Sequence, residues 1–186
     1  MTQSMQHRQR YGAMAQGLHW LSALAVAIAW GLGLLGGQFP KGSPRETAEF
    51  AHVVAGEVVV AMLVLRLIWR FIDPPPPASP SAMGRAADLA AKLGHLALYA
   101  LLLAVPAVGV ATLFASGDAL SIFGVGDFPS PWVKDRAFEH SLEEIHEILA
   151  HSLIALSAVH AVAAVIHHRI YRDDTLKRML PPAILR

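Results

Sequence analysis

The sequence contains no cysteine among its 186 residues. Disulfide bonds, cysteine-ligated iron–sulfur clusters and the Cys-x-x-Cys-His attachment of c-type haem are therefore excluded. Any metal centre in this chain must use histidine or carboxylate ligands instead. Histidine is abundant, with 10 residues, so the histidines are the first candidates for metal or cofactor chemistry.

Charge is also scarce. Charged residues make up 16% of the chain against 54% hydrophobic residues, and the formal net charge is only +1. A nucleic-acid partner would need a concentrated basic patch, and the lysines and arginines are instead scattered between apolar runs, so no nucleic-acid partner is expected. With a mean hydropathy of +0.44, the composition disfavours a water-soluble domain and indicates a protein surrounded by membrane lipid.

Three segments contain no Asp, Glu, Lys or Arg and are long enough to cross a membrane: residues 11–40, 93–117 and 148–168. A hydrocarbon core of about 30 Å needs about 20 apolar residues of helix. A cleaved signal peptide is the alternative for the first segment, but its apolar run is longer than the apolar region of a signal peptide. All three segments are therefore predicted to be transmembrane helices.

A fourth predicted span lies near residues 50–72, interrupted by Glu57 and Arg66. Charges inside a span need a partner or a function. Pro106 predicts a kink in the third span. The sequence thus predicts an all-α fold, an integral membrane four-helix bundle in a single domain over residues 1–186, with approximate spans 12–37, 50–71, 91–115 and 144–168.

Positive charges concentrate on the side of the predicted membrane that holds both termini. The cations on that side are Arg8, Arg10, Arg66, Arg70, Arg85, Lys92, Arg169, Arg172, Lys177, Arg178 and Arg186. The opposite side carries Lys41, Arg45, Lys134 and Arg136. Because cytoplasmic loops are enriched in Lys and Arg, we expect a multi-pass protein with both termini in the cytoplasm.

Four histidines fall at two matched depths in the predicted spans. His19 comes nine residues after Arg10 and His160 comes nine residues before Arg169, so both lie at a similar distance from the inner surface. On the outer side, His52 lies near the start of the second span. His146 lies among three glutamates at the start of the fourth. The depths predict an inner pair and an outer pair of histidines.

His146 and His160 are fourteen residues apart on one predicted helix. At 100° and 1.5 Å per residue they differ by about 40° in direction and by about 21 Å along the axis. One metal ion cannot span that distance, because ligating nitrogens lie about 2 Å from the metal. We therefore predict two centres, with His19 completing the inner one and His52 the outer one. A planar haem between two axial imidazoles fits an apolar bundle core.

Several stretches spread over nearly the whole chain point to a known family by their order and spacing. They are GLHW (17–20), FAHVVAG (50–56), RLIWRF (66–71), KLGHLALYALLLAVPAVG (92–109), IHEILAH (145–151) and VHAVAAVIHHRIYRDDTLKRMLP (159–181). Together they resemble the bacterial cytochrome b561 family. The resemblance implies a four-helix protein of the bacterial inner (plasma) membrane with two haem b groups, ligated by His19, His52, His146 and His160. The family includes a superoxide oxidase that passes electrons to ubiquinone.

Further polar residues are candidates for contacts with a haem propionate or a quinone. They are His95, Arg66, Arg70, His167 and His168. For each, the competing interpretation is structural: packing for the histidines, and anchoring at the inner membrane surface for the arginines. His151 points about 140° away from His146 and is expected to make a packing or interhelical contact. Glu57 is a candidate for proton uptake near the outer haem.

The predicted function is electron transfer from a periplasmic donor, with superoxide a candidate, across the membrane to quinone. Against superoxide stands an acidic outer segment, residues 117–147, because an anion is attracted by positive charge. The alternatives are an electron carrier or membrane anchor subunit for a dehydrogenase partner, and a haem-free structural or transport bundle. The sequence leaves the oligomeric state open.

Overall fold

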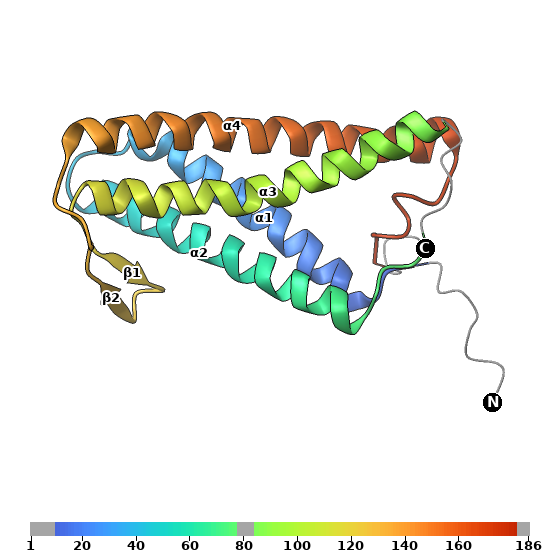
Figure 1. Cartoon of the computed structure of the whole chain (residues 1–186), viewed down its shortest axis with the longest axis horizontal. Helices are drawn as coiled ribbons and strands as arrows, with labels where there is room; N and C mark the ends of the chain where they lie inside the picture. The colour runs from blue at the N-terminus through green and yellow to red at the C-terminus, as the bar shows by residue number, and fades with distance from the viewer. Residues whose placement is uncertain (1–9, 78–83, 182–186) are drawn as a thin grey trace.

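The computed structural model describes residues 10–77 and 84–181 (Figure 1). Its four long helices are α1 (Ala13–Gly36), α2 (Ser43–Ile72), α3 (Arg85–Ala115) and α4 (Arg136–Ile166). A short antiparallel hairpin of β1 (Leu120–Ile122) and β2 (Gly126–Phe128) connects α3 to α4, and a π-helical turn, η1 (His167–Tyr171), continues α4. Arg8 and Arg186, which contribute to the predicted charge asymmetry, lie outside the described residues.

The long helices are each apolar enough and long enough to cross a membrane. This confirms the prediction of an α-helical, four-helix membrane bundle. The helices run beyond the apolar stretches, since α2 begins at Ser43 and α4 at Arg136. The helix ends therefore do not define the limits of the membrane-embedded parts, and those limits stay a prediction from the sequence.

Local sequence explains where the helices begin and bend. Gly42, which precedes α2, has a φ of 91°, a conformation that side chains with a Cβ rarely adopt. The Asp135 side chain accepts hydrogen bonds from the backbone N–H groups of Ala137 and Phe138, so it caps the start of α4. α3 contains Pro106 and changes direction along its length, as predicted (Figure 1).

The helices associate as two antiparallel pairs. α1 packs mainly against α2 and α3 mainly against α4, while α2 and α3 form a smaller contact between the pairs (Figure 1). We call the end that holds the start of α1 and the end of α4 the inner end. The end that holds the β hairpin is called the outer end.

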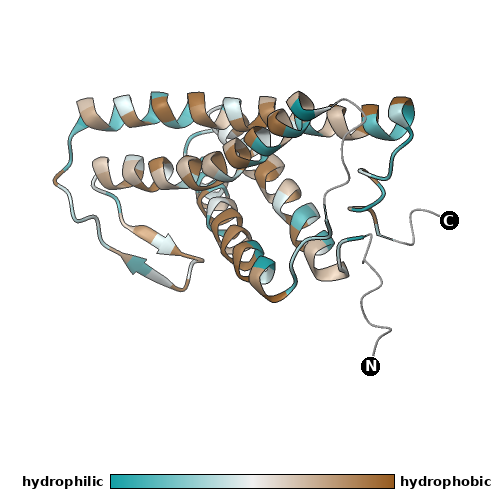
Figure 2. Cartoon of the chain, turned by 45° about the vertical axis from the view of Figure 1, so that its right-hand side comes forward, coloured by the Kyte–Doolittle hydropathy of each residue, from teal (hydrophilic) through white to brown (hydrophobic). Residues whose placement is uncertain are grey.

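Apolar side chains cover much of the outside of the bundle. Leu96, Ile148 and Val159 are 66%, 66% and 64% exposed, and hydrophobic residues extend along the helices (Figure 2). A water-soluble protein rarely exposes so much apolar surface, but lipid accommodates it. The exposed side chains thus form the lipid-facing surface.

The interior of the bundle is small and apolar. Its buried cluster consists of Ala25, Val59, Leu63, Leu102 and Leu153. Leu153 lies seven residues from both His146 and His160, midway between the two predicted centres. An apolar layer therefore separates the inner half of the bundle from the outer half.

The chain after η1 folds back onto the start of α1. Arg10 donates hydrogen bonds to the carbonyl oxygens of Lys177 and Leu180, at 2.9 and 2.8 Å. The indole N–H of Trp20 donates to the carbonyl of Met179 at 2.9 Å. These bonds join the two ends of the described chain across the inner end of the bundle.

The β hairpin was not predicted from the sequence. It lies against α2, because the Glu57 carboxylate accepts a hydrogen bond from the backbone N–H of Phe123 at 2.9 Å. A Cβ on Gly124 would lie 3.0 Å from the Phe50 ring, so backbone and ring are in close contact. Glu57 therefore anchors the connection between α3 and α4 to the second helix.

Candidate functional site

The outer pair of histidines comes together between α2 and α4. The ring centroids of His52 and His146 are 5.9 Å apart, and the ring planes make an angle of 81°. Both side chains are half-buried. The two residues are 94 positions apart in the sequence, so their meeting is a product of the bundle.

Each ring of the outer pair is fixed by a backbone carbonyl on another helix. The Nδ1 atom of His52 lies 2.8 Å from the carbonyl oxygen of Ala29 on α1, and that of His146 lies 3.0 Å from the carbonyl of Val105 on α3. Because a carbonyl oxygen only accepts, both Nδ1 atoms must donate. The Nε2 atom of each neutral ring is then unprotonated and able to bind a metal.

The inner pair forms between α1 and α4. The ring centroids of His19 and His160 are 6.3 Å apart, with 67° between the ring planes. Both rings are half-buried. Within the described part of the chain, the Nδ1 atom of His19 is buried and makes no hydrogen bond. The inner pair thus lacks one of the backbone contacts that orient the outer pair.

The spacing of both pairs can be compared with that of two imidazoles on one iron. If each ligating nitrogen is about 2 Å from the metal and about 1 Å from its ring centre, the two ring centres lie about 6 Å apart. The observed centroid separations are 6.3 and 5.9 Å. Residues 10–77 and 84–181 contain no group of three or more histidine or carboxylate ligands for a metal ion. The donor set therefore fits axial ligation of haem better than a zinc-type site.

The comparisons with known proteins agree with this geometry. The family model described as prokaryotic cytochrome b561 matches residues 10–182. The chain belongs to this family. Like other cytochromes b561, it is a membrane-embedded b-type cytochrome of electron transfer, and its family cofactor is haem b.

Individual relatives cover nearly the whole chain. Cytochrome b561 homolog 2 of Escherichia coli (strain K12) is 38% identical over 92% of both chains. Cytochrome b561 homolog 1 of the same organism is 39% identical, over 88% of this chain and 93% of the relative. A protein of Yersinia pestis named probable superoxide oxidase CybB is 30% identical, over 93% of this chain and 97% of its own length.

Two other inner candidates, His95 and Arg66, lie near His160. The His95 ring lies 5.3 Å from the His160 ring, between centroids, although His95 itself is exposed. Arg66 is half-buried, lies 5.4 Å above the Tyr99 ring and is close enough to both inner histidines to interact with them electrostatically. The inner layer of this cytochrome b561 therefore contains a third imidazole and a cation that its outer layer lacks.

Arg70 is exposed and does not belong to this cluster. Its side chain lies on the surface of α2, whereas Arg66, one turn earlier, is half-buried. The sequence predicts that both arginines are candidates for contacts with a haem propionate or a quinone. Of the two, Arg66 is the one positioned beside the inner histidines.

The two histidines at the end of α4 differ in their contacts. The Nδ1 atom of His167 lies 2.5 Å from a carboxylate oxygen of Asp173, while the Nδ1 atom of His168 is buried without a hydrogen bond among the described residues. Burial alone raises the pKa of Asp173, but hydrogen bonds from His167 and Thr175 outweigh burial and hold that pKa below its usual range. His167 is therefore engaged in stabilising the turn after η1.

His151 makes the interhelical contact expected of it. Its ring packs edge-on against Trp30 of α1, with 6.1 Å between centroids.

The sequence does not predict the carbonyl acceptors on Ala29 and Val105, because every residue carries a carbonyl and none is distinguished by its type. It also missed Tyr99, which faces Arg66 only in the folded bundle.

Proposed function

We propose that this cytochrome b561 binds two haem b groups, one between His19 and His160 and one between His52 and His146. We further propose that electrons cross the membrane from one haem to the other. The observation that supports this most strongly is the spacing of the ring pairs, 6.3 and 5.9 Å between centroids. Both values suit two imidazoles on opposite sides of one iron. The fourteen-residue interval on α4 separates the layers by about 21 Å.

Within such a site, the chain supplies ligands, orientation and a dry environment. Haem b, when bound, supplies reversible one-electron transfer. With two histidines holding each iron, no coordination position would stay open, so donors and acceptors would exchange electrons without binding the metal. Arg66 and His95, which lie near the inner histidines, would be the residues available to the propionates of an inner haem, with Arg66 providing the positive charge.

The expected direction follows from the distribution of positive charge. The inner end carries most of the cations and is assigned to the cytoplasm, with both termini there. In this orientation, electrons would pass from a periplasmic donor at the outer end to a quinone near the inner end, with the two histidine pairs holding the haems that would carry them. His167 and His168 lie at that end, and we include them as candidate quinone contacts.

Superoxide is the donor we propose first, because one relative bears the name probable superoxide oxidase. In the balanced reaction, two superoxide anions are each oxidised to dioxygen. One quinone takes up the two electrons and two protons to become quinol. Lys41, Arg45, Lys134 and Arg136 are the cations available at the outer end to attract the anion.

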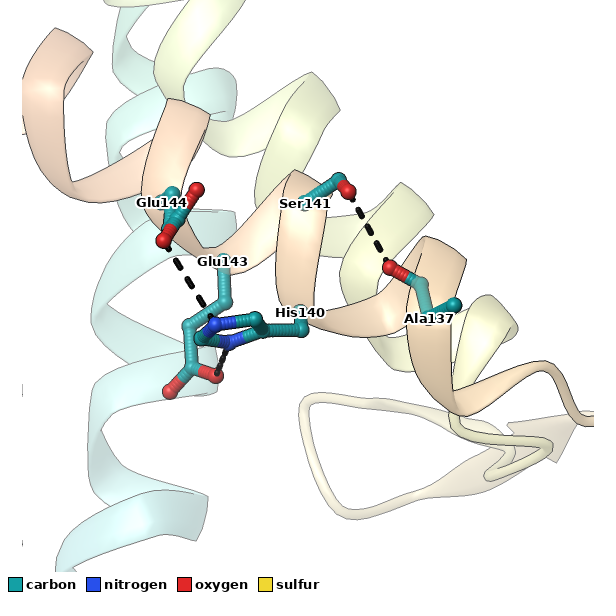
Figure 3. Close-up of polar contacts among 5 residues, drawn as sticks. All are labelled: Ala137, His140, Ser141, Glu143 and Glu144. Atoms are coloured by element: carbon teal, nitrogen blue, oxygen red, sulfur yellow. Dashed lines mark hydrogen bonds and ion pairs between the residues drawn. The ribbon is translucent and has the colours of Figure 1, made fainter.

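The acidic start of α4 favours a second candidate, an electron carrier or membrane anchor subunit for a dehydrogenase partner. His140 lies 3.9 Å from a Glu143 oxygen and 3.5 Å from a Glu144 oxygen (Figure 3). All three side chains are well exposed. An exposed cluster of this kind repels a small anion but suits a basic protein surface.

Purified, detergent-solubilised protein distinguishes these functions. Two b-type haems per chain in the optical spectrum, rapid haem reduction by pulsed superoxide and accumulation of quinol support the superoxide reaction. Haem reduction only by a co-purifying dehydrogenase supports the carrier or anchor. Absence of Soret absorption contradicts both and leaves a haem-free structural or transport bundle.

A further inference from the structure

The α1–α2 pair and the α3–α4 pair contain the same fourteen-residue intervals between a histidine and a second residue of interest. On α1, Gly33 follows His19 by fourteen residues, and on α3, Gly109 follows His95 by fourteen residues. The second helix of each pair repeats the interval: His52 is followed fourteen residues later by Arg66, and His146 by His160. The α1–α2 pair and the α3–α4 pair are therefore related as two copies of one pattern.

In both copies the glycine lies against the outer histidine. A Cβ built on Gly33 would lie 3.0 Å from Cε1 and 3.3 Å from Nδ1 of His52. A Cβ built on Gly109 would lie at the same two distances from the corresponding atoms of His146. Such contacts are tighter than side chains normally make, so any larger residue would displace the ring by a few tenths of an ångström.

The carbonyl that each histidine bonds lies one helical turn before that glycine. Ala29 precedes Gly33 by four residues, and Val105 precedes Gly109 by four. Residues four apart share a helix face. In both copies, therefore, the Cε1–Nδ1 edge of the imidazole lies against a glycine while its Nδ1–H points to a carbonyl on the same helix face.

We propose that Gly33 with the Ala29 carbonyl, and Gly109 with the Val105 carbonyl, are two copies of one device that positions the axial histidines of the outer haem. This rests on the proposed haem ligation by His52 and His146. The carbonyl accepts a hydrogen bond from Nδ1–H, which keeps the proton on Nδ1 and leaves Nε2 free to ligate the iron. The glycine lets the ring approach the neighbouring helix closely enough to make that bond. Together the two copies hold the ring planes nearly perpendicular.

The glycine contacts can be tested with alanine substitutions that have matched controls on the same helices. A Cβ on Gly31 of α1 or on Gly94 of α3 would meet nothing within 4 Å. We compare Gly33→Ala with Gly31→Ala, and Gly109→Ala with Gly94→Ala, in the purified full-length protein. The readouts are haem per chain and the low-spin ferric EPR spectrum, because the signal of each haem depends on the angle between its imidazole planes.

Gly33→Ala and Gly109→Ala should each shift the EPR signal of the outer haem and speed its loss to an apoprotein acceptor at least two-fold. The signal of the inner haem and both control variants should stay as in the unsubstituted protein. An unchanged outer signal in both variants, or equal changes in the controls, would overturn the proposal. If the unsubstituted protein itself fails to bind two haems, it is the proposed function that fails.

A second measurement needs no substitution and so does not depend on variants that fold. In the reduced protein, low-spin ferrous haem is diamagnetic, and the Nδ1 protons of the axial histidines can be followed by NMR. The proposal predicts slow exchange with water for the two outer Nδ1 protons, because both are bonded to carbonyls inside the bundle. Exchange of these protons within the dead time of the measurement would contradict it.

Discussion

The outer and inner histidine pairs have similar spacing but are held in different ways. The outer rings donate to backbone carbonyls of neighbouring helices, whereas the Nδ1 atom of His19 is buried without a partner within the described residues. Beside the inner pair lie Arg66 and the additional ring of His95. The outer pair is therefore oriented by backbone contacts, and the inner pair depends more on neighbouring side chains.

The repeated fourteen-residue pattern explains how this asymmetry arises. In the first copy, the position that corresponds to His160 is occupied by Arg66, and in the second copy the position that corresponds to His19 is occupied by His95. One histidine from each copy, His19 and His160, forms the inner pair. The remaining two positions place the cation of Arg66 and the imidazole of His95 beside the inner pair.

The largest effect is expected from removing a ligand of only one layer. His160→Ala should reduce bound haem from two to one per chain and leave the outer centre spectroscopically intact, because about 21 Å of helix separates the layers. Haem content by pyridine haemochrome and the optical spectrum provide the measurement. His151→Ala, on the same helix, is the control and should keep both haems. Retention of two haems by the His160 variant would refute the ligand assignment.

Removing the inner cation should change the inner haem's reduction potential without removing the haem. At an effective dielectric constant near 20, a unit charge about 10 Å from the iron would contribute about 1.7 kcal/mol, or about 70 mV for one electron. Arg66→Gln should lower the inner potential by about that amount, because a nearby positive charge stabilises the reduced form. Redox titration of both haems measures it.

Two variants sharpen the comparison. Arg66→Lys retains the charge and should recover much of the potential, whereas Arg70→Gln, on the exposed surface of α2, should have a much smaller effect. A fall of the outer potential equal to that of the inner one would mean that Arg66 acts on the bundle as a whole.

The sequence predicts the bundle and the depth of the histidines because both follow from local composition. Long uncharged runs must cross the lipid, and nine-residue offsets from Arg10 and Arg169 place His19 and His160 at one level. The hairpin at Leu120–Phe128 could not be predicted in this way, because its three-residue strands are stabilised by contacts with α2. The equal spacing of Gly33 and Gly109 from upstream histidines is visible in the sequence, but only the folded bundle brings each glycine into contact with an outer histidine.

The outer end should respond to loss of the hairpin anchor. Glu57→Ala removes the acceptor for the Phe123 N–H and should cost about 1 kcal/mol of stability, a fall in Tm of about 2–4 °C. Hydrogen exchange at Phe123 should accelerate while the inner end stays protected. Glu147→Ala, an exposed acidic residue on α4, is the control. If the two variants have equal effects, the Glu57–Phe123 bond does not anchor the hairpin.

The smallest effect is expected at the inner end, where Asp173 bonds His167. The pKa of Asp173 is below its usual range, so this carboxylate contributes stability above its unfolded-state pKa, and the contribution is lost as the pH falls through the folded-state value. Because the side chain is 35% exposed, solvent screening limits the effect to roughly 0.5 kcal/mol. Asp173→Asn should abolish this acid-dependent step in hydrogen exchange of the 173–175 backbone. An unchanged step would assign it to another group.

The apolar layer of Ala25, Val59, Leu63, Leu102 and Leu153 has an electrical consequence. Under the proposed electron path, an electron that crosses this layer would move net charge through most of the membrane's insulating thickness. Moving one elementary charge across the whole bilayer against 100 mV costs about 2.3 kcal/mol. For electrons travelling toward a negatively polarised cytoplasm, the membrane voltage acts as a brake, and collapsing that voltage in vesicles should speed reduction of the inner haem.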